Sequence, residues 1–174
     1  MSKRALLTRP EPDPARDRAA LEPEADRAVV FGRDYDVPAR IVLLAHSKPE
    51  HVMRWFGPPG YPLTMCEMDF RVGGRFRFAM TAPNGQQMTP FGGEYLDIVP
   101  NARISYTNGF EQPNAERMTV TLTFTEENGR TRLRMEALFS SAAMKQYHLS
   151  RGYQQGVNAG LDQLADVARE IATG

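Results

Sequence analysis

Glu94 is the residue whose chemical type and position stand out in the sequence. It alternates with Leu96 and Ile98, which are expected to face inward, while Tyr95 and Asp97 fall on the opposite face of the strand. A carboxylate on an apolar wall would have a raised pKa, and it could bind a ligand hydroxyl or act as an acid or base. The alternative is that Glu94 lies at the end of its strand and reaches water.

The other reactive residues do not combine into a recognisable site. The three histidines, His46, His51 and His148, form no His-Glu-x-x-His motif and have no cysteine pair beside them, so we predict no metal site. Cys66 is in phase with Met68, which favours a buried apolar thiol over a nucleophile. The sequence shows no Ser-His-Asp or paired-carboxylate constellation, so we assign no catalytic residue and predict no cofactor.

Length and composition narrow the classes of protein. The chain has 174 residues, which is enough for one domain with a sizeable core. Lys and Arg number 21, as do Asp and Glu, and a net charge of zero argues against a nucleic-acid-binding surface. The single cysteine and the lack of an apolar run long enough to span a bilayer predict a cytoplasmic protein without a membrane span.

The N-terminal part of the chain differs from the rest. Residues 1–26 are rich in proline and charged residues and are predicted to form a flexible tail, whereas residues 27–174 are predicted to form the domain. The pattern from residue 28 to residue 31 predicts a first strand. Two short helices are expected between it and Trp55, before a loop rich in glycine and proline.

The remaining sequence is typical of a sheet followed by a helix. Alternation of apolar and polar residues between positions 66 and 139 predicts about six antiparallel strands with one apolar face. Asn128-Gly129 predicts a tight hairpin, because both residues tolerate positive φ angles. From position 153 to position 171, apolar residues spaced by three and four predict a long amphipathic helix that covers the sheet.

Several short motifs resemble the SRPBCC superfamily, and their combined order is more specific than any one of them. The resemblance runs from about Arg27 to Ala168 and is strongest to the bacterial homologues of the activator of heat-shock protein 90 ATPase. The segments that carry it are Pro38-Ala39, Trp55-Phe56-Gly57-Pro58, Asp69-Phe70-Arg71-Val72-Gly73-Gly74-Arg75-Phe76, Gly93-Glu94-Tyr95-Leu96-Asp97-Ile98, Arg103-Ile104-Ser105-Tyr106-Thr107 and Val120-Thr121-Leu122.

This resemblance implies an α+β START-like helix-grip fold. In that fold a curved antiparallel sheet of six to seven strands wraps around a long C-terminal helix, with two short helices after the first strand. The sequence departs from the family pattern at two positions. Val157 follows Gly156 where relatives often carry tryptophan, and Asn108 follows Thr107 where an aromatic residue is common. Both changes are expected to reshape or enlarge the pocket between sheet and helix.

We therefore hypothesise a protein that binds an unidentified small hydrophobic molecule in that pocket. A co-chaperone-like interaction module and a cyclase- or hydrolase-type enzyme are the alternatives, since fold alone does not fix function. A homodimer is left open. Trp55 either gates the pocket or anchors a helix end. The residues predicted to line the pocket are Trp55, Phe70, Phe76, Phe78, Glu94, Leu96, Tyr106, Leu122, Tyr153 and Val157.

Overall fold

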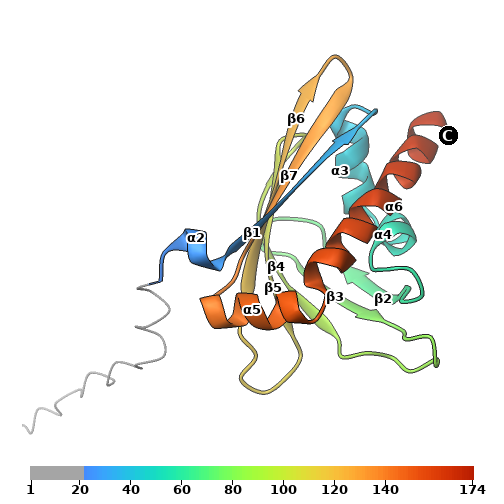
Figure 1. Ribbon diagram of the computed structural model, residues 1–174. Coiled ribbons are helices and arrows are strands. Elements are labelled where there is room, and N and C mark those ends of the chain that lie inside the picture. The colour runs from blue at the N-terminus through green and yellow to red at the C-terminus, as the bar shows by residue number, and fades with distance from the viewer. Residues whose placement is uncertain (1–21) are drawn as a thin grey trace, which may run out of the picture.

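A computed structural model describes residues 22–174, and within them seven antiparallel strands form one curved sheet (Figure 1). The strand order is β1-β7-β6-β5-β4-β3-β2, which confirms the predicted α+β helix-grip fold. Because β1 and β2 lie at opposite edges, the chain between them crosses the whole sheet. The strands are β1 (Ala28–Tyr35), β2 (Leu63–Met68), β3 (Arg75–Met80), β4 (Phe91–Val99), β5 (Arg103–Phe110), β6 (Met118–Glu127) and β7 (Arg130–Leu138).

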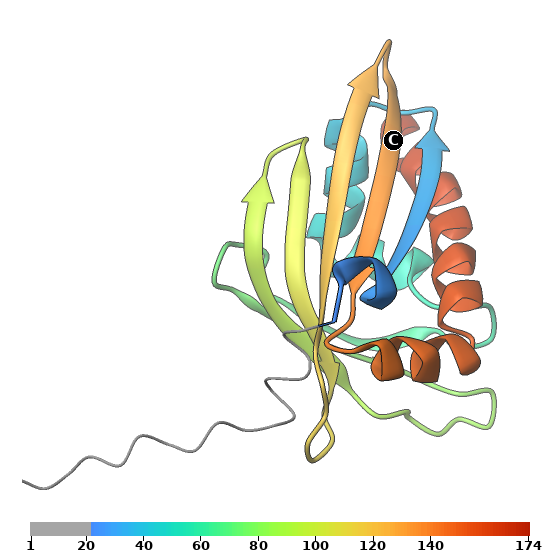
Figure 2. The same ribbon diagram turned by 60° about the vertical axis from the view of Figure 1, so that its left-hand side comes forward.

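Three of the helices lie together against one face of the sheet (Figure 2). Two of them, α3 (Ala39–Ser47) and α4 (Pro49–Trp55), occupy the crossing between β1 and β2. The third, α6 (Tyr153–Thr173), follows the shorter α5 (Ala142–Ser150). The α6 residues that are buried lie three and four apart, as the amphipathic pattern predicted; they are Gly160, Leu161, Leu164, Val167 and Ala168.

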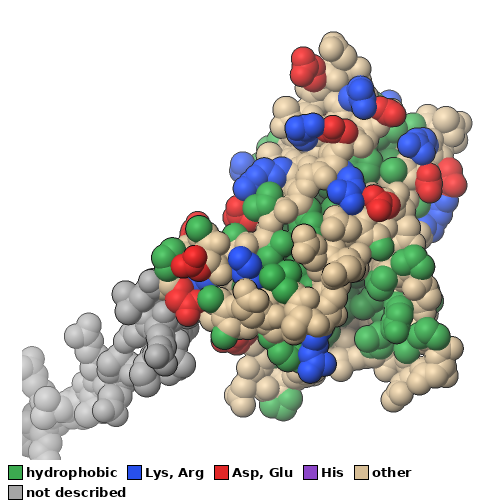
Figure 3. Space-filling view, in the orientation of Figure 1, with side chains coloured by type: hydrophobic (Ala, Val, Ile, Leu, Met, Phe, Trp, Pro, Cys, Tyr) green, Lys and Arg blue, Asp and Glu red, His purple; other side chains and the backbone are tan. Residues whose placement is uncertain are grey.

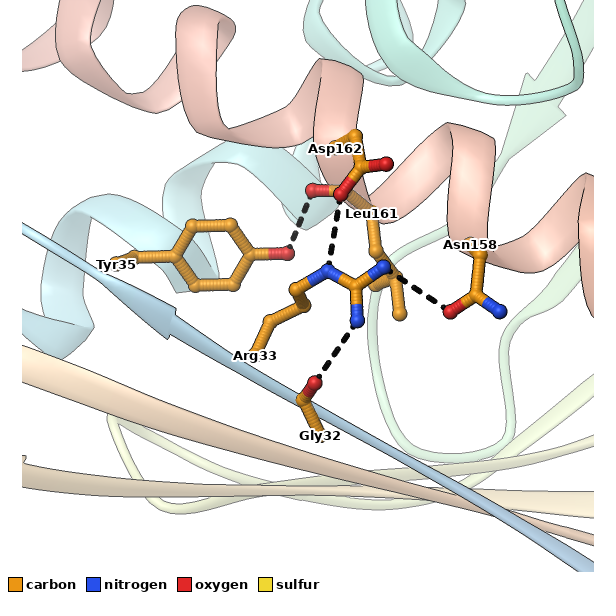
Figure 4. A network of polar contacts seen from close by, with 6 residues as sticks. All are labelled: Gly32, Arg33, Tyr35, Asn158, Leu161 and Asp162. Carbon is orange, nitrogen blue, oxygen red and sulfur yellow. Dashed lines mark hydrogen bonds and ion pairs between the residues drawn. The ribbon is translucent and has the colours of Figure 1, made fainter.

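The C-terminal helix is fastened to the β1 edge of the sheet (Figure 4). The Tyr35 hydroxyl donates a hydrogen bond to the Leu161 carbonyl at 2.9 Å. The Arg33 guanidinium donates to Asp162 Oδ1 through Nε and to Asn158 Oδ1 through a terminal nitrogen, both at 3.0 Å. Helix α6 also packs against α3 and α4; of these two helices, α3 contacts β6 and β7, and α4 contacts β2 at the other edge of the sheet.

The hairpin between β6 and β7 has the predicted turn. Asn128 has φ of 51° and Gly129 has φ of 73°, so both residues occupy the left-handed region that a two-residue turn of this kind requires. The registry runs without interruption from Thr119 opposite Leu138 to Glu127 opposite Arg130. This long hairpin therefore forms a regular part of the sheet next to its β1 edge.

The residues just before the predicted start of the domain at residue 27 are in contact with it. Residues 1–21 of the predicted tail lie outside the described residues. The five tail residues that are described pack on the domain, because α2 (Glu24–Arg27) contacts α5. A carboxylate oxygen of Glu22 accepts a hydrogen bond from the Ala142 amide at 2.5 Å, and Arg27 donates to the Phe139 carbonyl at 2.9 Å. Glu22 thereby caps the first turn of α5.

Candidate functional site

A small cavity lies between α3–α4 and the middle and β2 side of the sheet, with a volume of about 50 Å³. Helices α3 and α4, two loops and strands β2 to β6 all contribute to its wall. By comparison, a single water molecule requires about 10–15 Å³, so the cavity has room for a few waters. Its lining residues are His46, Val52, Trp55, Phe56, Met68, Phe70, Phe76, Phe78, Phe91, Tyr95, Ile104, Tyr106, Asn108 and Leu122.

The lining is aromatic and carries no acidic or basic side chain apart from His46. Neighbouring rings meet mainly edge to face, as in the Phe76–Tyr106 pair, whose centroids lie 5.3 Å apart at an interplanar angle of 84°. Burial raises the pKa values of the Tyr95 and Tyr106 hydroxyls, so both stay protonated. The wall therefore favours uncharged contents, because a buried charge without a partner is costly.

His46 is the titratable imidazole of the cavity wall. Desolvation lowers its pKa to about 4, with a smaller opposing effect from a hydrogen bond to a main-chain carbonyl. Its Nδ1 lies 2.8 Å from the Val42 carbonyl oxygen, a contact that requires the proton on Nδ1. At neutral pH, His46 is therefore uncharged and its Nε2 is a hydrogen-bond acceptor.

Trp55 is held as an anchor at the end of α4. Its indole Nε1 donates to the Ala45 carbonyl at 2.9 Å, and only 8% of its surface is exposed. The main-chain carbonyl of Trp55 accepts a hydrogen bond from Gln163 Nε2 on α6 at 3.0 Å. The same nitrogen donates to the Gly57 carbonyl at 2.7 Å, so Gln163 satisfies the end of α4. These contacts favour the anchor over the gate for the role of Trp55.

Six residues of the predicted lining come together at this cavity, and four do not. The six are Trp55, Phe70, Phe76, Phe78, Tyr106 and Leu122. Glu94 and Leu96 are exposed on the other face of β4, so Glu94 takes the alternative position in which it reaches water, and neither residue lines this cavity. The register of β4 against β5 shifts between Tyr95 and Asp97, so Ile98 points inward although Leu96 does not. A bulge of this kind cannot be seen in a period-two pattern.

The two α6 residues of the predicted lining also lie elsewhere. Tyr153 packs edge to face against Phe139, with centroids 5.4 Å apart, and its hydroxyl lies 3.6 Å from the sulfur of Met118. Val157 is partly buried against the core. The cavity is thus beneath α3 and α4, not beneath the C-terminal helix as predicted. The smaller side chain at position 157 does not enlarge it.

The sequence analysis expected Asn108 to reshape the pocket but did not include this polar residue among the residues that line it. Asn108 lines the cavity, and its side-chain oxygen, Oδ1, is buried without a hydrogen-bond partner among the described residues. A signal was present, because Asn108 lies in phase with Ile104 and Tyr106, which face the same side of β5. His46 was likewise considered only as a metal ligand.

Residues 22–174 show no arrangement suited to metal binding, to crossing a membrane or to nucleophilic attack by cysteine. No group of three or more His, Cys, Asp and Glu side chains there is placed to hold a metal ion. None of the described helices is long and apolar enough to cross a membrane. Burial raises the pKa of the half-buried Cys66 to about 11, which opposes thiolate formation.

A larger open hollow lies on the sheet near residues 109–117 and has mixed charge. Arg77 and Glu111 form an exposed ion pair across it, with Nε and Oε1 2.5 Å apart. This pairing lowers the pKa of the Glu111 carboxyl.

The chain resembles known proteins over most of its length. The model of a family described as "Activator of Hsp90 ATPase homolog 1-like protein" matches residues 36–169. No curated protein matches the chain. A crystal structure of a Chromobacterium violaceum protein shares 28% identity, has a TM-score of 0.70, and the match covers 82% of this chain and 96% of that one. A Nitrosomonas europaea protein gives 21% identity, a TM-score of 0.78 and coverages of 87% and 100%.

Proposed function

The chain belongs to the family of Activator of Hsp90 ATPase homolog 1-like proteins, and on that premise we propose that it binds a small, uncharged, largely apolar molecule in the cavity beneath α3 and α4. The observation that carries this proposal is the composition of the wall. Aromatic side chains from α4, three strands and two loops converge on one space without an acidic or basic partner other than neutral His46. Such a space suits a neutral apolar ligand.

The size of the cavity sets a limit on the ligand. An apolar cavity that takes up benzene measures roughly 150 Å³, whereas this one measures about 50 Å³. A molecule of about one ring is therefore accommodated only if the wall moves. Phe56 and Phe70 are the lining residues that lie outside helices and strands, in the α4–β2 and β2–β3 loops. Loops move at lower cost than sheet strands, so we assign entry to this side.

The surface supports the same route. Figure 3 shows hydrophobic side chains gathered over the β2–β3 end of the sheet and the neighbouring α4–β2 loop. Phe56 itself is only partly buried, and its ring stacks on Phe91 with centroids 5.8 Å apart. Movement of Phe56 away from the cavity therefore costs only its aromatic contacts, because its side chain makes no hydrogen bond.

Trp55 makes the proposal directly testable. It is the single tryptophan of the chain and it lines the cavity, so its indole N–H gives one NMR signal that reports on occupancy. Native mass spectrometry of the protein from its host identifies co-purifying molecules, and titration with single-ring aromatic compounds follows the Trp55 signal. We expect saturable shifts of this signal.

A matched pair of variants locates the binding. Leu122→Phe adds volume inside the cavity, whereas Leu96→Phe adds the same group on the exposed face, where Leu96 is 46% accessible. Only the first is expected to abolish the Trp55 response. Equal responses from both variants, or no co-purifying molecule together with no saturable shift, would contradict ligand binding in this cavity.

A co-chaperone-like role is the second candidate, and the family description supports it. Val30 and Leu96 are apolar, exposed and on strands, with 51% and 46% of their surfaces accessible, so a partner protein could cover them. The test is the ATPase rate of the host's Hsp90-type chaperone with and without this protein. Stimulation that is lost in Leu96→Asp but retained in Leu122→Phe would favour this role over ligand binding.

A further inference from the structure

We infer that the ligand is an uncharged aromatic alcohol, such as a phenol, whose hydroxyl donates a hydrogen bond to the side-chain oxygen of Asn108. This inference rests on the proposed ligand-binding function and adds the chemical class of the ligand. Its basis is the single buried side-chain oxygen or nitrogen without a partner among the described residues, Asn108 Oδ1, which belongs to the cavity wall.

The sheet places Asn108 in a row of residues that face the cavity side. Met68 pairs with Phe76, Phe76 pairs with Gly93, and Asn108 pairs with Met118. Gly93 falls opposite Asn108, because Gly92 pairs with Gly109 and Tyr95 pairs with Tyr106. Directly paired residues share a face of the sheet, so these five positions cross it in one line.

The neighbours of Asn108 in this row cannot satisfy its oxygen. Gly93 has no side chain, and a Cβ built there would lie 1.9 Å from the Thr107 carbonyl oxygen, so the position cannot carry a donor group. Met118 has no donor, and its sulfur faces the Tyr153 hydroxyl at 3.6 Å. The protein thus leaves a buried acceptor toward the cavity, and such an acceptor is costly unless a donor reaches it.

The remaining polar groups define the rest of the ligand. His46 is neutral, with its proton on Nδ1, so its Nε2 is a second acceptor on the wall. Tyr106 has a protonated hydroxyl on the same strand as Asn108. A ketone could pair with that hydroxyl but has no donor for the Asn108 side-chain oxygen, and a carboxylate would bring an unpaired charge. A hydroxyl-bearing aromatic ring satisfies Asn108 and packs against Phe76 and Tyr106.

The experiment compares phenol with toluene, which has nearly the same shape but no donor. Dissociation constants are measured from the Trp55 indole N–H signal for the wild-type protein, Asn108→Leu and Thr107→Val. The last variant is the control, since Thr107 is adjacent on β5 and its hydroxyl accepts from the Glu94 amide instead. If Asn108→Leu does not fold, Asn108→Val provides the same comparison, and melting curves identify folded variants.

We expect the preference for phenol over toluene to fall at least about fivefold in the Asn108 variant and to stay unchanged in Thr107→Val. A preference that is equal in all three proteins would overturn the inference while leaving ligand binding intact. That result would mean that water already satisfies Asn108 and that the ligand does not displace it. If neither compound binds to the wild-type protein, the proposed function fails for this class of ligand, and the inference fails with it.

Discussion

The Tyr35 hydroxyl donates a hydrogen bond of 2.9 Å to the main-chain carbonyl of Leu161, which joins the end of β1 to the middle of α6. Both residues are almost fully buried, with 2% and 3% of their surfaces exposed. Burial is also the main cause of the raised pKa of Tyr35. The bond therefore connects two elements that lie far apart in the sequence, in a region that water does not reach.

Tyr35→Phe is expected to reduce the free energy of unfolding by about 1 kcal/mol, because the change removes one buried hydrogen bond and keeps the ring. Chemical denaturation measures this difference. Tyr147→Phe is the control, since Tyr147 is 53% exposed and its change should stay within about 0.5 kcal/mol. Equal effects from the two variants would show that the Tyr35–Leu161 bond adds nothing to stability.

The lowered pKa of His46 leads us to expect that the free energy of unfolding decreases in mildly acidic solution. Its pKa is lowered by desolvation from 6.5 to about 4 in the folded protein, so the unfolded chain takes up the proton first. Stability that is present above pH 6.5 therefore falls as the pH drops toward 4. At about 1.4 kcal/mol per pKa unit, the unfolding free energy falls by at most ~3 kcal/mol. The loss is smaller than this limit because the His46 side chain is partly exposed to water, which reduces the cost of charging it.

The measurement is the unfolding free energy of wild type and His46→Phe between pH 4 and 7. The variant keeps an aromatic ring beside Trp55, whose centroid lies 4.8 Å from that of His46. It should lose the part of the pH dependence that His46 contributes. His148, whose pKa burial also lowers, titrates in both proteins and cancels in the difference. A difference that stays constant over this range would refute the assignment.

The fold could be predicted from the sequence because its signals are local. The Asn128-Gly129 turn and the alternation in β6 and β7 follow from backbone preference and from burial of one face. The apolar stripe between positions 153 and 171 correctly predicted a long amphipathic C-terminal helix. The pattern could not predict which elements this stripe packs against, and these are largely α3 and α4 instead of the middle of the sheet.

The site was predictable only in part, because some of its residues are placed by contacts between strands that leave no signal in the local sequence pattern. Phe76, Phe78 and Leu122 follow their strands' alternation without interruption and line the cavity as expected. Glu94 precedes a shift of register and Leu96 lies within it; this shift depends on pairing between β4 and β5 and has no local signal. Asn108 was noticed as a departure from the family pattern, but its burial depends on Gly93 and Met118 in neighbouring strands.

The contact of Glu22 with α5 leads us to predict that the folded domain begins before residue 27, where the composition placed its start. Its carboxylate accepts from the Ala142 amide at the first turn of α5, where negative charge is favourable. Glu22→Ala should therefore lower the unfolding free energy by about 0.5–1 kcal/mol. Glu22→Gln keeps an acceptor and should recover part of the loss. If both variants equal the wild type in denaturation curves, Glu22 does not cap α5 in solution.

Asn108 gives a prediction of the opposite sign, in which a polar residue is replaced and stability rises. The buried Oδ1 of Asn108 has no partner among the described residues, and a buried acceptor in that condition costs about 1–3 kcal/mol. Asn108→Leu removes the acceptor and retains a similar shape beside Gly93 and Met118. The ligand-free protein should therefore gain stability of about 1 kcal/mol or more.

The control for this gain is Thr107→Val, which also replaces a polar by an apolar residue on β5 but removes the hydroxyl that accepts from the Glu94 amide at 3.1 Å. That variant should be neutral or slightly destabilised, so a gain confined to Asn108→Leu cannot come from the β propensity of an apolar residue. A loss of stability in Asn108→Leu would mean that solvent in the cavity pairs with Asn108. A protein that keeps an unfavourable polar group at such a position forgoes stability that it could gain, and that is the pattern expected of a residue that serves binding.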